Sequence, residues 1–221
     1  MKRFGWMHGT LVLLLIAASG AQGLGQAASV LPVKVLVQSP AETKTELQIF
    51  CLFRSAPENT LHGSLVEIND KLHGLLDQIR KPGLFGGELG ETILLTPPVG
   101  TLAAKRVLII GLGDSATFTP ERMYLVSKIA LREANRLGVA HPFFGPTILD
   151  GGVTKFATGE VAGQVVQGLC DAVATESVLR AGGAAGALVA VDFTFLAGAA
   201  HAAETQSGID RALGKTASSS R

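Results

Sequence analysis

Aromatic residues, charge of either sign and cysteine are all scarce in this 221-residue chain. Phe, Trp and Tyr together make up 5% of the sequence, and the formal net charge is +1. Few aromatic side chains argue against stacking on single-stranded bases, and a near-neutral charge argues against electrostatic attraction to nucleic acid or to a membrane surface. We therefore expect neither a nucleic-acid partner nor, once the N-terminal segment described below is removed, a membrane partner.

The sequence contains two cysteines, Cys51 and Cys170. Cys51 lies in an apolar stretch typical of a strand, and Cys170 lies on the apolar face of a predicted helix. We expect two buried free thiols. An oxidising compartment would permit a disulfide, but the sequence does not show whether the two Cα atoms lie within the roughly 7 Å that a bridge requires.

Motifs for catalysis and metal binding are lacking. The chain has no Gly-x-Ser-x-Gly elbow and no pair of carboxylates in a context typical of acid–base chemistry. His62 and His73 lie about 16 Å apart along a predicted helix, too far to share a metal. Asp70, His73 and Asp77 share a helical face and could chelate weakly, but a solvated face opposite a leucine stripe is the favoured interpretation. We predict no catalytic residue, no metal ligand and no cofactor.

The N-terminus has the pattern of a secretory signal. Lys2 and Arg3 precede the apolar run at 11–18, and small residues follow it. This run is too short to span a bilayer, which needs roughly 20 apolar residues, so cleavage is favoured over anchoring. We predict a signal peptide over residues 1–27, cleavage after Ala27 and export, with the periplasm as the expected compartment.

Hydrophobic patterning predicts alternating strands and helices over residues 28–200. The expected strands span 33–39, 45–53, 91–98, 105–113, 142–152 and 186–198, and the expected helices span 61–79, 120–137 and 155–178. The first two strands are expected to form a hairpin or to lie side by side. Residues 201–221 are predicted to be a partly disordered tail with at most one short helical turn.

This alternation predicts an α/β fold. Continuously apolar strands suit a sheet covered on both faces, so we expect a three-layer α/β/α sandwich with a mixed, largely parallel sheet.

A glycine turn follows the strand at 105–113 and provides the candidate ligand site. Gly111, Gly113, Asp114 and Ser115 are the residues that a nucleotide or small anion would contact there. A dinucleotide fingerprint requires a helix that opens at the turn, whereas here the helix begins only near Pro120. The favoured interpretation is therefore a tight strand exit in which glycine supplies unusual backbone angles.

Three segments resemble the N-terminal domain of leucyl aminopeptidases, and the likeness extends roughly from Val33 to Phe195. They are "GSLVEINDKLHGLLDQI", "GLFGGELGETILLTPPVGTLAAKRVLIIGLGDSATFTPERM" and "GEVAGQVVQGL". The resemblance implies a macro-domain-like sandwich that carries no catalytic residues and helps to assemble a hexamer. The family's two-metal site lies in a C-terminal domain, marked by K-G-x-T-F-D-S-G-G-like and N-T-D-A-E-G-R-like motifs, and this sequence contains neither.

Three functional hypotheses follow from the residues and the resemblance. The first is an exported, non-catalytic binding or assembly module that associates with itself or with an unknown protein. The second is a macro-like domain that binds a nucleotide or small anion. The third, aminopeptidase activity inherited from the family, is not supported by the residues present.

Overall fold

The computed structural model describes residues 31–56, 60–81 and 84–219, and the side chains within these ranges up to residue 214. The predicted signal peptide over 1–27 lies outside the described residues. Within them, no helix has the length and apolar character needed to cross a membrane.

Six strands form one sheet in the order β1-β6-β5-β2-β4-β3. Every neighbouring pair is parallel except β3 and β4, which are antiparallel. The expected hairpin of the first two strands is wrong, because β6 and β5 lie between β1 and β2. The strands are β1 (Val33–Val37), β2 (Gln48–Leu52), β3 (Thr92–Leu95), β4 (Val107–Gly111), β5 (Phe143–Gly145) and β6 (Phe193–Ala197).

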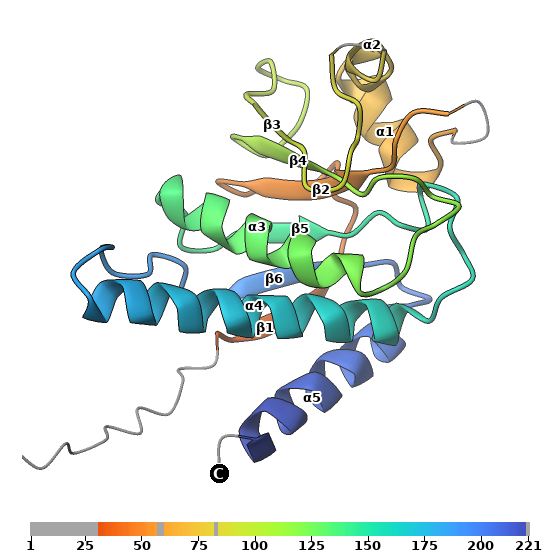
Figure 1. Cartoon of the computed structure of the whole chain (residues 1–221). Coiled ribbons are helices and arrows are strands. Elements are labelled where there is room, and N and C mark those ends of the chain that lie inside the picture. Colours follow the sequence, from red (N-terminus) through yellow and green to blue (C-terminus); the bar gives the residue numbers. More distant parts are fainter. Residues whose placement is uncertain (1–30, 57–59, 82–83, 220–221) are drawn as a thin grey trace, which may run out of the picture.

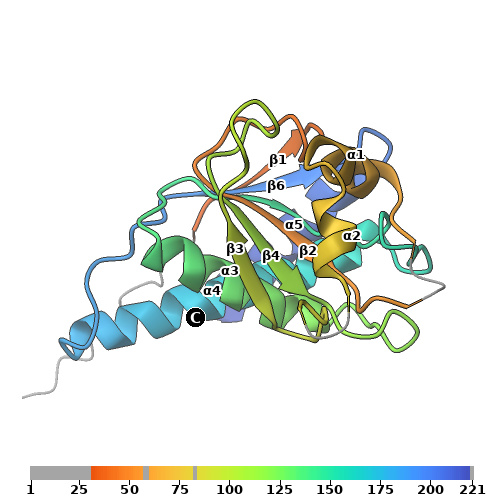
Figure 2. The same cartoon turned by 90° about the horizontal axis from the view of Figure 1, so that it is seen from above.

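Helices cover both faces of this sheet, as Figures 1 and 2 show. One face packs against α1 (Gly63–Lys71) and α2 (Leu75–Ile79), and the other against α3 (Arg122–Arg136), α4 (Thr158–Ala181) and α5 (Ala202–Ser219). Alternate residues of β2 point to opposite faces, so Phe50 joins the core under α1 while Cys51 joins the core under α4. The predicted three-layer α/β/α sandwich is confirmed.

The helix expected over 61–79 is two helices. His73 and Gly74 both have positive φ, at 56° and 79°. The side-chain oxygen of Asn69 accepts a hydrogen bond from the amide of Leu76 at 3.0 Å, so it caps the start of α2. The leucine stripe stays continuous across the break, which is why the sequence pattern concealed it.

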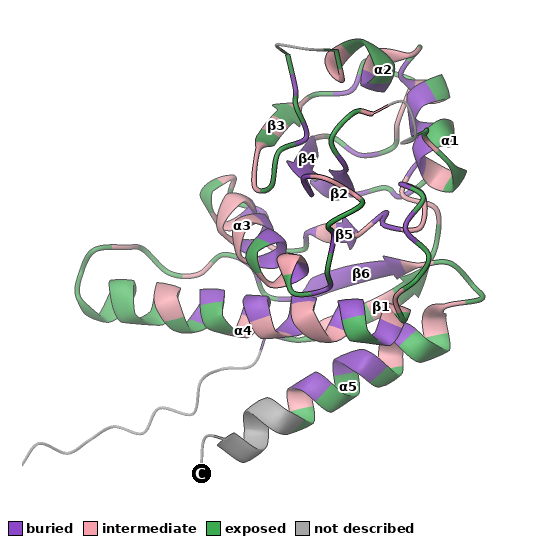
Figure 3. Ribbon diagram, turned by 45° about the vertical axis from the view of Figure 1, so that its right-hand side comes forward, coloured by how far each residue is buried: buried purple, intermediate pink, exposed green. Residues whose placement is uncertain are grey.

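The C-terminal segment is helical, so the expectation of at most one short turn after residue 200 is wrong. α5 begins at Ala202 and packs along α4 (Figure 3). A Cβ added to Gly208 would lie 2.0 Å from the carbonyl oxygen of Gly159, so glycine lets the two helices approach closely. Helix propensity read from the sequence alone does not reveal a helix of this kind, because tertiary packing supplies most of its stability.

Neither Cys51 nor Cys170 forms a disulfide. Cys51 is buried in the middle of β2, and this burial raises the pKa of its thiol well above the ordinary value. Cys170 lies on α4 and is only partly buried, so the expectation of two buried thiols holds for Cys51 alone.

Candidate functional site

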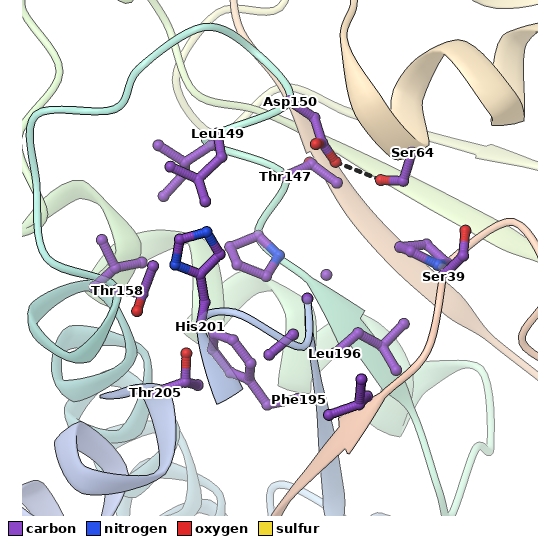
Figure 4. Close-up of a pocket in the computed structure, with 18 of the residues that line it drawn as sticks. Ser39, Ser64, Thr147, Leu149, Asp150, Thr158, Phe195, Leu196, His201 and Thr205 are labelled. Atoms are coloured by element: carbon purple, nitrogen blue, oxygen red, sulfur yellow. Dashed lines mark hydrogen bonds between the residues drawn. The ribbon is translucent and has the colours of Figure 1, made fainter. Parts of the chain in front are cut away.

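A pocket of about 530 Å³ lies beyond the carboxyl ends of β1, β5 and β6. The connections that leave these three strands form its walls, so residues distant in the sequence meet there (Figure 4). Ligands of open α/β sheets bind at the carboxyl ends of strands, in cavities of this size. The position and volume therefore mark this pocket as the candidate site.

Apolar side chains form most of the wall. Phe195 and Leu196 come from β6, Val37 from the end of β1, and Leu149 from the connection after β5. Phe156 precedes α4 and packs edge-on against Phe118, with ring centroids 5.7 Å apart. These contacts give the cavity a firm apolar lining, suited to the uncharged part of a small molecule.

Polar groups gather on two opposite sides of the pocket. His201, Thr205 and Thr158 lie at the starts of α5 and α4, while Ser64 and Asp150 lie across the cavity (Figure 4). Ser64 donates a short hydrogen bond to the Asp150 carboxylate. The amide of His62 donates to the Asp150 carbonyl at 2.8 Å, so this side of the wall is tied to the start of α1.

Thr147 connects the pocket wall to the centre of the sheet. It is a β-branched residue with a φ of 49°, a conformation that costs roughly 1–3 kcal/mol. Its hydroxyl donates to the carbonyl of Cys51 at 2.6 Å and accepts from the Cys51 amide at 3.0 Å. The hydroxyl thus takes the place of a strand partner after β5 ends, and it holds the pocket loop against β2.

The predicted ligand residues lie at the exit of β4, and none of them lines this pocket. The amide of Gly111 donates to the Glu91 carbonyl and that of Gly113 to the Gly87 carbonyl, both at 2.8 Å. A Cβ at Gly111 would lie 2.0 Å from the carbonyl oxygen of Glu88. Backbone from another loop therefore packs directly against this turn.

Polar side chains complete the turn at the end of β4. The guanidinium of Arg122 donates to the carbonyls of Leu112 and Asp114, both at 3.0 Å. The carboxylate of Asp114 accepts from the amide of Ala116 at 2.8 Å. Ligand binding at Gly111, Gly113, Asp114 and Ser115 stays a prediction, and the geometry described here gives the turn a structural role.

No group of three or more His, Cys, Asp or Glu side chains is placed to hold a metal ion within the described parts of the chain. Of the three residues that could chelate weakly, Asp77 accepts a hydrogen bond from the Asn69 amide group at 2.8 Å. His73 occupies the break between α1 and α2. Asp77 and His73 thus belong to the junction between α1 and α2 and have a structural role there.

A charged cluster lies at the opposite, amino-terminal edge of the sheet. The carboxylate of Asp192 accepts from Lys34 at 2.5 Å and from Nδ1 of His141 at 3.0 Å. Burial of Asp192 opposes its ionisation, but the hydrogen bonds from Lys34 and His141 outweigh that effect and hold its pKa below the usual range. This cluster fastens the starts of β1, β5 and β6 together.

The sequence alone did not point to His201 or Thr205. Both belong to the segment expected to be a tail, which carries no acidic or cysteine neighbour pattern around His201. One sequence signal was available: Ile209, Ala212 and Leu213 are apolar at positions i, i+3 and i+4, which is the period of a helix face. That pattern would have predicted a packed helix, although not a pocket at its start.

The comparisons agree with this architecture. A model of the N-terminal domain of the cytosol aminopeptidase family matches residues 49–171. A probable cytosol aminopeptidase from Burkholderia mallei is 34% identical over 73 residues, which are 33% of this chain and 14% of that protein. The chain therefore matches only a small part of that relative's length.

Solved structures extend the likeness to the whole fold. A tomato leucine aminopeptidase mutant superposes with a TM-score of 0.58 at 16% identity, covering 85% of this chain and 36% of that one. A Trypanosoma brucei macrodomain in complex with ADP-ribose superposes with a TM-score of 0.57 at 14% identity, covering 82% and 68% of the two chains. At such identities the likeness establishes the fold alone.

Proposed function

Because the chain belongs to the cytosol aminopeptidase family through its N-terminal domain, we propose that it is a binding domain without peptidase activity of its own. We place its ligand in the pocket beyond β1, β5 and β6. The observation that carries this proposal is the pocket itself, a cavity of about 530 Å³ at the sheet edge where α/β folds bind small molecules.

The arrangement of potential metal-ligating side chains supports a non-catalytic role. Two-metal hydrolysis requires several carboxylate or imidazole ligands within a few ångströms of each other, and the described residues hold no such group. The sequence also lacks the motifs expected for the family's catalytic domain. Purified protein should leave a leucyl anilide intact in the presence of Mn²⁺ or Zn²⁺, and metal-dependent hydrolysis that a chelator abolishes would refute this part of the proposal.

Nucleotides are the first probes for the pocket, because a macrodomain of the same fold has been solved with ADP-ribose. We expect adenosine, ADP or ADP-ribose to raise the melting temperature. A ligand at 100 times its Kd stabilises the folded state by about 2.7 kcal/mol, which corresponds to a rise in Tm of roughly 5–10 °C. The absence of any shift with all three probes would exclude these adenine compounds as ligands.

A pair of neighbouring substitutions shows whether binding occurs in this pocket. Ala199 lines the cavity, whereas Ala200 is an exposed residue that does not. Ala199→Trp should place a large side chain in the cavity and abolish the ligand-induced shift, while Ala200→Trp should retain it. If Ala199→Trp still binds as the wild type does, the ligand lies elsewhere.

Self-association is the second candidate function. β1 is an edge strand, and Val37 at its end is 54% exposed. An open edge with exposed apolar residues can pair with another chain, although Lys34 near the start of the strand works against this. Light scattering coupled to size exclusion tests it, and a monomer over the whole accessible concentration range would rule it out.

Export is proposed on the sequence pattern of residues 1–27. Expression of the full chain in a Gram-negative host should deliver a protein that begins near residue 28 to the periplasm. Fractionation followed by mass spectrometry of the N-terminus measures this directly. An intact N-terminus in the cytoplasmic fraction would contradict the proposal.

A further inference from the structure

One hydroxyl in the pocket lacks a partner. Thr205 is 1% exposed and lines the cavity, and its hydroxyl makes no hydrogen bond to any residue that the structure describes. The Thr205 oxygen points toward His201 and the cavity in Figure 4. Unlike Gln48 Oε1, which is buried without a hydrogen-bond partner among the described residues, the Thr205 oxygen is not itself sealed off but reaches the cavity. It is therefore available to a group that a ligand supplies.

The same corner of the pocket holds the start of a long helix. α5 begins at Ala202, and the connection 198–201 leads into it from β6. The amide of Thr205 donates to the carbonyl of His201 at 2.9 Å, so Ala202, Ala203 and Glu204 make up the first turn. Amides in a first turn have no partner within the helix and carry the positive end of its dipole.

The nearby acidic groups are already engaged. The carboxylate of Glu204 accepts from both the amide and the hydroxyl of Thr158, at 3.2 and 2.7 Å, and so caps α4. Asp150 is bonded to Ser64 on the opposite wall (Figure 4). No lysine or arginine lines the cavity among the described residues, so positive potential there comes from helix starts such as that of α5.

We infer that the first turn of α5, together with the hydroxyl of Thr205 and the ring of His201, forms a subsite for an oxyanion, either the phosphate or the carboxylate of a ligand. This inference rests on the proposed function, because it assigns chemistry to one part of the same pocket. The apolar wall at Phe195 and Leu149 would then receive the uncharged remainder of the ligand.

Titration of the ¹⁵N-labelled protein with inorganic phosphate, and separately with acetate, tests the subsite at constant pH and ionic strength. We expect saturable amide shifts at residues 198–205 and none at 111–115. A response to phosphate alone or acetate alone supports the subsite and identifies the preferred headgroup. Shifts that are absent, unsaturable or confined to other residues would overturn it.

Two threonine substitutions show whether the hydroxyl of Thr205 itself contributes to anion binding. Thr205→Val keeps the β-branched shape and removes only the hydroxyl, and it should weaken binding of the responding anion by roughly tenfold. Thr175→Val is the control, since its hydroxyl bonds to the Asp171 carbonyl on an exposed part of α4. Equal affinity in wild type and Thr205→Val would refute the role of Thr205.

The oxyanion subsite can be refuted without refuting the proposed binding function. If adenosine stabilises the protein and Ala199→Trp removes that effect, the pocket binds a ligand whatever the anions do. A protein that binds adenosine in this pocket but shows no shift with phosphate or acetate would overturn the oxyanion subsite and leave the binding function in place.

Discussion

Two strand exits on the same edge of the sheet differ in what occupies the space beyond them. After β4, the glycine turn at 111–113 is covered by the backbone of residues 87–91, and the amides of Gly111 and Gly113 donate to carbonyls of that loop. After β5 and β6, the connections separate and enclose a cavity of about 530 Å³. Both regions follow apolar parallel strands, yet only one leaves room for a ligand.

The difference shows that a glycine turn is not by itself a ligand site. Phosphate-binding turns need amides that point at the ligand and have no other partner. At the exit of β4 those amides are consumed within the fold, so glycine there serves close backbone approach. At the start of α5 no glycine motif is present, but His201 and Thr205 line the cavity.

The largest effect on stability is expected from a side chain added at the exit of β4, which the backbone of residues 87–91 covers. Gly111→Ala would place a Cβ 2.0 Å from the carbonyl oxygen of Glu88, so the backbone must shift. We expect a loss of about 3 kcal/mol in the free energy of unfolding, measured by urea denaturation. Gly186→Ala, where a Cβ would meet nothing within 4 Å, should change it by less than about 0.5 kcal/mol. A fully stable Gly111→Ala would mean that the turn is looser than described and would break the comparison.

The second-largest effect on stability is expected in the pocket wall after β5. Thr147→Val keeps the β-branched shape at positive φ and removes the hydroxyl that bonds to both backbone groups of Cys51. Leaving those buried groups unpaired should cost about 2 kcal/mol of stability. Thr101→Val removes an exposed hydroxyl that donates to the Pro98 carbonyl and should be nearly neutral. Equal denaturation midpoints for the two variants would show that Thr147 does not hold the pocket loop.

The smallest effect on stability is expected at the amino-terminal edge of the sheet, and it depends on pH. Asp192 has a lowered pKa, so its ionised form stabilises the fold above the ordinary aspartate pKa of about 4, and this contribution is lost as pH falls through the lower folded value. Asp192→Asn should cost about 1 kcal/mol at pH 7, and its difference from wild type should shrink at acid pH.

Asp210→Asn is the matched control for that pH series. Asp210 is exposed and accepts from the Gln206 amide at 2.8 Å, so its loss should change stability by less than about 0.5 kcal/mol. A difference between wild type and Asp192→Asn that stays constant from pH 7 to pH 3 would contradict the role assigned to the ionised carboxylate.

Much of the fold was predictable from local pattern. The continuously apolar run at 105–113 predicted a strand covered on both faces, and β4 is buried throughout. The similar run at 91–98 is instead the half-exposed, antiparallel edge strand β3. Gly138, with a φ of 71°, follows the end of α3 close to the expected boundary at residue 137. Partner choice was not predictable, since the strands inserted between β1 and β2 come from residues 143–145 and 193–197. The candidate site was missed because its polar groups lie on connections that meet only once the sheet has formed.

The sequence by itself determined the layers of this protein, because burial of an apolar strand or helix face depends on residues that are close together in the chain. It also determined the resemblance to the aminopeptidase N-terminal domain. Only the tertiary structure decided which strand exit is closed and which is open. That choice depends on whether backbone from residues 87–91 covers the exit of β4 and on where the start of α5 lies, and contacts between distant segments leave no local pattern in a sequence.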